Sequence, residues 1–129
     1  MVKIVVVDED KHQVILIKGV LEKYNIEVLG YDINNGMTSD ELLNQVVDSD
    51  IDLLMIDFLL SDRGIVAFNG DLIYRKFQEL RPQFPSIIFT SNEPDAFILV
   101  DNPNIIYEKD MATDPNKVGK FVSILEKKY

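Results

Sequence analysis

Carboxylate, hydroxyl and amine side chains follow several short apolar runs of this sequence. The candidate functional residues share this position at the end of a run: Asp8, Glu9, Asp10, Asp57, Thr90 and Lys109. Carboxylates gathered in one place suit a divalent cation, because such cations prefer hard oxygen ligands. The sequence therefore predicts an acidic site with a hydroxyl and an amine beside it, provided that the runs end at the same edge of the fold.

The run Leu53–Ile56 is apolar without a break and stops at Asp57. An apolar run with no alternation is typical of a strand that is buried on both faces, as in a parallel sheet. Asp57 then lies at the carboxyl end of this strand. That end is the edge at which open α/β sheets place their ligand sites.

Strands and helices are expected to alternate along the whole chain. Strands are predicted at residues 2–7, 26–31, 51–57, 86–91 and 104–109. Helical spacing and capping residues predict helices at residues 12–24, 38–47 and 71–80, in a short segment from Pro94, and from Asp114 onward. The alternation favours the α/β class, with a doubly wound five-stranded parallel sheet, helices on both faces and one domain over residues 1–129.

The composition narrows the classes of function. The formal net charge of −9 argues against binding nucleic acid by neutralising phosphates. The chain has no cysteine, which excludes disulfides and thiolate metal sites. No apolar run approaches the roughly 20 residues that span a bilayer, and the N-terminus has no signal-peptide pattern. We therefore expect a cytoplasmic location, with no membrane and no direct nucleic-acid partner.

In this order and at these strand ends, the polar residues resemble those of response-regulator receiver domains, the phosphoacceptor half of two-component signalling. The resemblance covers essentially the whole chain and implies the flavodoxin-like receiver fold. It rests on the segments that follow four of the strands: Val5–Asp10, Asp57, Thr90–Ser91 and Lys109.

The resemblance implies a role for each side chain in phosphoryl transfer. Asp57 is the expected phosphoacceptor and catalytic nucleophile, which takes a phosphoryl group from a phosphohistidine. Thr90 and Lys109 are expected to contact the phosphoryl group, with Lys109 also catalytic. The implied partners are a histidine kinase or phosphotransfer protein and a downstream target that the sequence does not name. Such a protein signals by conformational change and is not a turnover enzyme.

The resemblance also implies a Mg²⁺ cofactor. Its expected ligands are the carboxylates of Asp8, Glu9 and Asp57 and the backbone carbonyl of Leu59. The family commonly has a second aspartate at the position of Glu9, so Asp10 is an alternative ligand in its place. The alternative interpretation of Asp10 is that it caps the first helix and binds no metal.

Other positions depart from the family pattern. Asp110 follows Lys109 where a proline is usual, which makes a cis peptide bond unexpected. The loop of residues 58–70 is longer than the common strand-to-helix link of about 2–6 residues. It ends at Asn69-Gly70, where the family has Asp-Gly.

Two departures concern signalling and lifetime. Ile106 occupies the place of the family's switch aromatic, and the adjacent Tyr107 is expected to face the other side of the sheet. Leu59 and Asn92 stand where the family positions a hydrolytic water. Since leucine cannot hydrogen-bond that water, a long-lived phospho-form is predicted.

Two other functions compete with a working receiver. One is a pseudo-receiver, a protein-interaction module that kept the fold without regulated phosphorylation. The other is a haloacid-dehalogenase-like phosphohydrolase, in which Asp8 is the nucleophile and Asp10 the acid/base. The location of an acyl phosphate, on Asp8 or on Asp57, separates the enzyme from the receiver.

Overall fold

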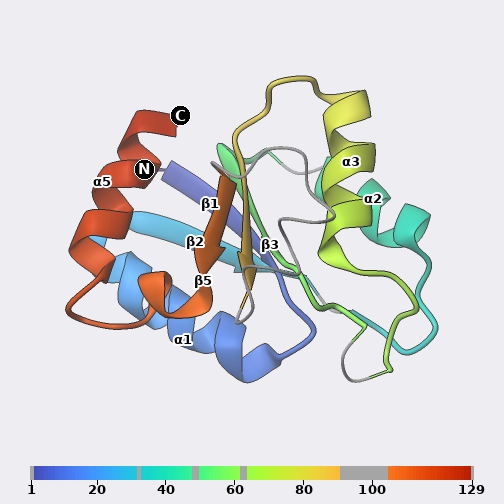
Figure 1. Ribbon diagram of the computed structural model, residues 1–129, viewed down its shortest axis with the longest axis horizontal. Coiled ribbons are helices and arrows are strands. Elements are labelled where there is room, and N and C mark those ends of the chain that lie inside the picture. Colours follow the sequence, from blue (N-terminus) through green and yellow to red (C-terminus); the bar gives the residue numbers. More distant parts are fainter. Residues whose placement is uncertain (1, 32, 48–49, 62–63, 91–104, 129) are drawn as a thin grey trace.

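A five-stranded, all-parallel sheet forms the centre of the protein (Figure 1). The computed structural model describes residues 2–31, 33–47, 50–61, 64–90 and 105–128. The strands are β1 (Val2–Val7), β2 (Ile26–Gly30), β3 (Leu53–Asp57), β4 (Ser86–Thr90) and β5 (Ile106–Glu108). Their order across the sheet is β2-β1-β3-β4-β5. The reversal of strand order beside β1 is the doubly wound arrangement that the alternation predicted.

Helices cover both faces of this sheet. They are α1 (Lys11–Leu21), α2 (Ser39–Val47), α3 (Gly70–Leu80) and α5 (Val118–Lys128), with short 3-10 helices at Glu22–Tyr24 and Lys109–Ala112. In Figure 1, α1 and α5 lie on one side of the strands, and α2 and α3 lie on the other. Most buried apolar side chains divide accordingly into one core shared with α1 and α5 and a second core shared with α2 and α3. A smaller third cluster contains Phe58, Ile88, Ile105 and Ile106.

The central strands contribute to both cores, because successive side chains of a strand point to opposite faces. In β3, Leu53 and Met55 belong to the core on the α1/α5 side. Leu54 and Ile56 belong to the core on the α2/α3 side. All four side chains are fully buried. This two-sided burial explains why the run carries no polar residue until Asp57.

The starts of α1 and α2 have the caps that the sequence predicted, whereas the last helix starts later in the chain than predicted. Before α2, the Glu41 amide donates to Thr38 Oγ1 (3.2 Å) and the Thr38 amide donates to Glu41 Oε1 (3.3 Å), which is the predicted capping box. Asp10 is the N-cap of α1, where its Oδ1 accepts from the His12 amide. The last helix begins at Val118 and not at Asp114, because turns closed by hydrogen bonds to Asp114 come first. The predicted helix from Pro94 lies outside the described residues.

Candidate functional site

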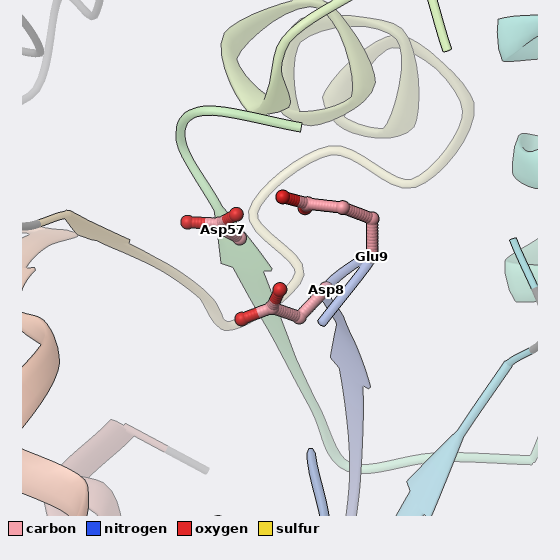
Figure 2. Close-up of side chains that lie close together, drawn as sticks. All are labelled: Asp8, Glu9 and Asp57. Carbon is pink, nitrogen blue, oxygen red and sulfur yellow. The ribbon is translucent and has the colours of Figure 1, made fainter. Parts of the chain in front are cut away.

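Three carboxylates meet at the carboxyl edge of the sheet. Val7 of β1 pairs with Ile56 of β3, so Asp8 and Asp57 come next to each other where the two central strands end. Figure 2 shows the Glu9 side chain turned toward the carboxylate of Asp57, with Asp8 beside them. Oxygen atoms of the three groups lie within 4.8 Å of one another. The sequence prediction that these acids share one edge is confirmed in position.

Burial makes this cluster electrostatically costly. Asp8 is 2% exposed and Asp57 is 1% exposed. Among the described residues, Asp8 Oδ2, Glu9 Oε2 and Asp57 Oδ2 have no hydrogen-bond partner. Burial and the charge of Asp57 raise the pKa of Asp8 to about 6. Burial and the same charge raise the pKa of Glu9 to about 8. The acids are therefore held close together without enough donors to satisfy them.

Lys109 supplies a cation to this cluster. It comes directly after β5, and its Nζ lies 2.9 Å from Asp57 Oδ1 and 3.9 Å from Asp8 Oδ2. Burial alone would lower the pKa of Lys109, but the ion pair with Asp57 and the charge of Asp8 outweigh it, so its pKa is raised. The lysine is charged at neutral pH and can attract an anion to the same place. No peptide bond between described residues is cis, so Asp110 follows Lys109 through a trans bond.

The chemistry of this donor set fits a hard divalent cation. Three carboxylates converge, and each has a buried or partly buried oxygen that no protein donor satisfies. Mg²⁺ prefers such oxygen ligands and retains several waters. Asp10 lies outside this cluster of three, since its Oδ1 caps α1, so the geometry does not favour it as the substitute for Glu9. The Leu59 side chain packs beside Phe58 and Ile88, and the role of its carbonyl remains a prediction.

Thr90 lies at the same edge of the sheet. It is the last residue of β4, is 1% exposed, and follows Phe89, which pairs with Asp57. Its place one strand away from the carboxylates agrees with the expected position of the hydroxyl. Its contact with a phosphoryl group remains a prediction.

The two residues at the switch position face opposite sides of the sheet, as the sequence predicted. Ile106 is buried with Phe58 and Ile88. Tyr107 packs edge-on against Phe121 of α5, with ring centroids 6.0 Å apart. The aromatic ring is therefore on the α5 side, and the place of the usual switch aromatic is filled by an isoleucine.

The loop between β3 and α3 is tied to both of its ends. The Gly70 amide donates to the Phe58 carbonyl (2.8 Å), and Asn69 Oδ1 accepts from the amide and the hydroxyl of Ser61 (3.0 and 2.7 Å). A Cβ on Gly70 would lie 2.2 Å from the Asp57 carbonyl oxygen. These residues were not among the candidates, and the Asn69-Gly70 pair at the helix start was the only sequence signal for them.

A groove of about 430 Å³ opens beside Glu9. Its lining residues come from the segments after β1 and β2, the first turn of α1 and the long loop: Glu9, Asp10, Lys11, His12, Ile33, Asn34, Asn35 and Ile65. His12 is exposed on α1, in agreement with the surface role expected for it. Of the three clustered acids, Glu9 is the one that lines this groove.

No helix in the described part of the chain is long and apolar enough to cross a membrane.

Comparison with known proteins supports the fold through structure alone. No family model matches the chain, and no curated protein matches its sequence. The non-phosphorylated receiver domain of RcsB from Escherichia coli is 21% identical, with a TM-score of 0.74 over 98% of this chain and 93% of that one. The response regulator TrrA of Thermotoga maritima, solved in complex with Mg(2+)-BeF, is 16% identical, with a TM-score of 0.71 over all of both chains.

Another match is to a longer response regulator, of which this chain covers only a part. The chain spans 60% of the length of RcsB from Salmonella typhimurium, with 21% identity and a TM-score of 0.73. A CheY-like receiver domain protein from Methanospirillum hungatei is 24% identical and is covered over 94% of its length. Together with the strand order and the acids at the sheet edge, these matches show that the chain has the receiver-domain fold of response regulators.

Proposed function

We propose that this chain is a phosphoacceptor receiver domain over residues 1–129, with Asp57 as the residue that is phosphorylated. The observation that carries the proposal is the buried group of Asp8, Glu9 and Asp57, with Lys109 Nζ 2.9 Å from Asp57 Oδ1. This acidic cluster is buried beside Lys109, and several of its oxygens have no donor among the described residues. It suits a site that takes up a cation and an anionic group together.

The protein's own residues account for much of the transfer step. A carboxylate oxygen of Asp57 attacks phosphorus, the bond from phosphorus to the donor histidine nitrogen breaks, and the imidazole takes the electron pair. Lys109 is already within ion-pair distance of Asp57, so its ammonium group can contact a phosphoryl oxygen on Asp57 without a large rearrangement. Thr90 would donate its hydroxyl to another phosphoryl oxygen.

Asp8, Glu9 and Asp57 would hold Mg²⁺, with the Leu59 carbonyl as a further ligand. When bound, this cation would offset the repulsion between the acidic cluster and the incoming phosphoryl group. In its absence, Asp8 and Glu9 hold protons more tightly than ordinary carboxyls because they are buried beside Asp57. Cation uptake at neutral pH is therefore expected to release protons from these two residues.

The proposed partners follow from this chemistry. The donor is a histidine kinase or a phosphotransfer protein, and the output is a change of conformation that a target protein recognises. A cytoplasmic location belongs to the same proposal. The protein is phosphorylated once and reset, and it does not turn over a substrate as an enzyme does.

Intact-mass spectrometry after incubation with Mg²⁺ and acetyl phosphate tests the proposal. A gain of one phosphoryl group is expected in the unmodified protein and is expected to be lost in Asp57→Asn. Peptide mapping after borohydride reduction would locate the acyl phosphate. Glu126→Gln, which removes an exposed acid on α5, is the matched control and should behave as the unmodified protein does.

Other outcomes would select another function. An acyl phosphate on Asp8, with steady release of phosphate, would identify the phosphohydrolase in place of the receiver. No gain of mass from acetyl phosphate or from a phosphorylated phosphotransfer domain, in protein that binds Mg²⁺, would favour a pseudo-receiver.

A further inference from the structure

The start of α3 contains an asparagine that does not act as a helix cap. Asn69 is at the N-cap position, where asparagine is among the most favourable residues, yet its side chain makes no capping hydrogen bond. Its Oδ1 instead accepts from the Ser61 amide (3.0 Å) and the Ser61 hydroxyl (2.7 Å). The side chain therefore joins the far end of the long loop to its near end.

This junction isolates a short turn directly after Asp57. The turn from Phe58 to Ser61 is fixed at its start by the Phe58 amide, which donates to the Phe89 carbonyl of β4 (3.0 Å). The Gly70 amide holds the Phe58 carbonyl (2.8 Å), and Leu60 is fully buried beneath the turn. Ser61, at the other end of the turn, is fixed by Asn69.

Without this junction, the hydrogen bond from the Gly70 amide to the Phe58 carbonyl would be left to join the turn to the start of α3 in the described part of the loop. A loop that spans residues 58–69 has many more conformations than a turn closed after Ser61, and closing it costs conformational entropy. Gly70 lies close to the phosphoacceptor candidate, since a Cβ added to it would lie 2.2 Å from the Asp57 carbonyl oxygen. A shift of the helix start would therefore move the main chain of Asp57.

We propose that Asn69 is a positioning residue that holds the Asp57 carboxylate in place through Ser61 and the turn of residues 58–61. This inference rests on the proposed function in assigning the cation and the phosphoryl group to Asp57. The positioning itself is a property of the metal-free protein and can be measured there.

The first test uses the metal-free protein. Asn69→Ala removes the acceptor, and Asn69→Asp keeps an oxygen in the same place. Amide hydrogen exchange of Gly70, which donates to the Phe58 carbonyl, is expected to be about tenfold faster in Asn69→Ala. The amide chemical shifts of Asp57 and Phe58 are expected to change in Asn69→Ala and to stay near the original values in Asn69→Asp.

The second test is calorimetric titration with Mg²⁺. Asn69→Ala is expected to bind Mg²⁺ about tenfold more weakly, as is typical when a residue that orients a ligand is removed, and Asn69→Asp is expected to recover most of the affinity. Asn44→Ala, which replaces an exposed asparagine on α2, is the control. Thermal unfolding of each variant separates a loss of positioning from a general loss of stability.

The two proposals fail in different ways. If the unmodified protein neither binds Mg²⁺ nor gains a phosphoryl group, the proposed function is wrong, and the exchange and shift measurements still decide the role of Asn69. If the unmodified protein does both, and Asn69→Ala matches Asn44→Ala in Gly70 exchange, Asp57 shifts and Mg²⁺ affinity, the positioning role is overturned.

Discussion

Asp8 is expected to destabilise the metal-free protein, and its replacement by asparagine would measure by how much. Asp8 is 2% exposed, and its Oδ1 accepts from the Asp10 amide (2.9 Å). Asparagine has the same shape and can keep this hydrogen bond. The substitution therefore removes the buried charge beside Asp57 and leaves the packing in place.

The size of the effect follows from the pKa of Asp8, which burial and the charge of Asp57 raise from 3.8 to about 6. Because the folded state holds the proton more tightly than the unfolded state, the stability from this group is present below pH 4 and is lost as the pH rises through 6. The loss corresponds to about 3 kcal/mol at neutral pH. Asp8→Asn should avoid this loss.

Urea unfolding followed by circular dichroism, in the presence of a metal chelator, is the assay. The free energy of unfolding of Asp8→Asn should exceed that of the unmodified protein by up to about 3 kcal/mol at pH 7.5, and the difference should fall toward zero near pH 3.5. Glu126→Gln is the control and should show no such trend. A difference that does not depend on pH, or a variant that is less stable at pH 7.5, would refute the reasoning.

Mg²⁺ should narrow the difference in stability between the two proteins. At a free Mg²⁺ concentration ten times the dissociation constant, the unmodified protein should gain about 1.4 kcal/mol, and Asp8→Asn should gain much less. The chelator should remove this gain. Equal stabilisation of both proteins would show that the cation binds elsewhere.

Three further predictions concern the ion pair between Lys109 and Asp57, the start of α3 and the hydrophobic core. Lys109→Gln should bind Mg²⁺ more tightly, because the cluster loses a competing positive charge, while phosphorylation from acetyl phosphate slows by about tenfold or more; parallel changes in both measurements would contradict this. Gly70→Ala should reduce both Mg²⁺ affinity and the free energy of unfolding, because its Cβ has no space against Asp57. Gly119→Ala has open space around its Cβ, so it should raise the free energy of unfolding by up to about 1 kcal/mol in urea unfolding. Phe77→Ala should cost about 3–5 kcal/mol in the same assay, since the ring is fully buried against Phe84, and Mg²⁺ affinity of the folded fraction should not change.

The sequence predicted the sheet well, because its strands are buried on both faces and carry an uninterrupted apolar signal. The run at Leu53–Ile56 identified β3, and the polar residues that follow each run identified the carboxyl edge. The capping pattern at Thr38 placed the start of α2 in the same way. These features depend on neighbours in the sequence, so they can be read without knowing the fold.

Contacts between distant side chains could not be predicted in the same way. The sequence left open whether Glu9 or Asp10 joins the acidic cluster. In the structure the Glu9 carboxylate lies within the cluster, and Asp10 accepts from the His12 amide at the start of α1. The contact between Asn69 and Ser61 depends on the course of a loop that has no periodic pattern. The last helix begins at Val118, after turns closed by hydrogen bonds to Asp114, and the spacing of apolar residues did not indicate these turns.

The long loop also contacts a second loop, and this has a consequence for the order of folding. The Gly36 amide donates to the Ile65 carbonyl (2.8 Å), which joins the segment before α2 to the segment after β3 (Figure 1). Because the two segments are far apart in the sequence, we expect them to meet only after β3 has paired with β1 and α3 has packed on the sheet. A contact that needs several earlier long-range contacts is expected to form after the rate-limiting step. Ile65→Ala, which shortens a side chain packed against the core on the α2/α3 side at this junction, should therefore have a φ-value near 0. The same junction should then be among the first parts of the native protein to open.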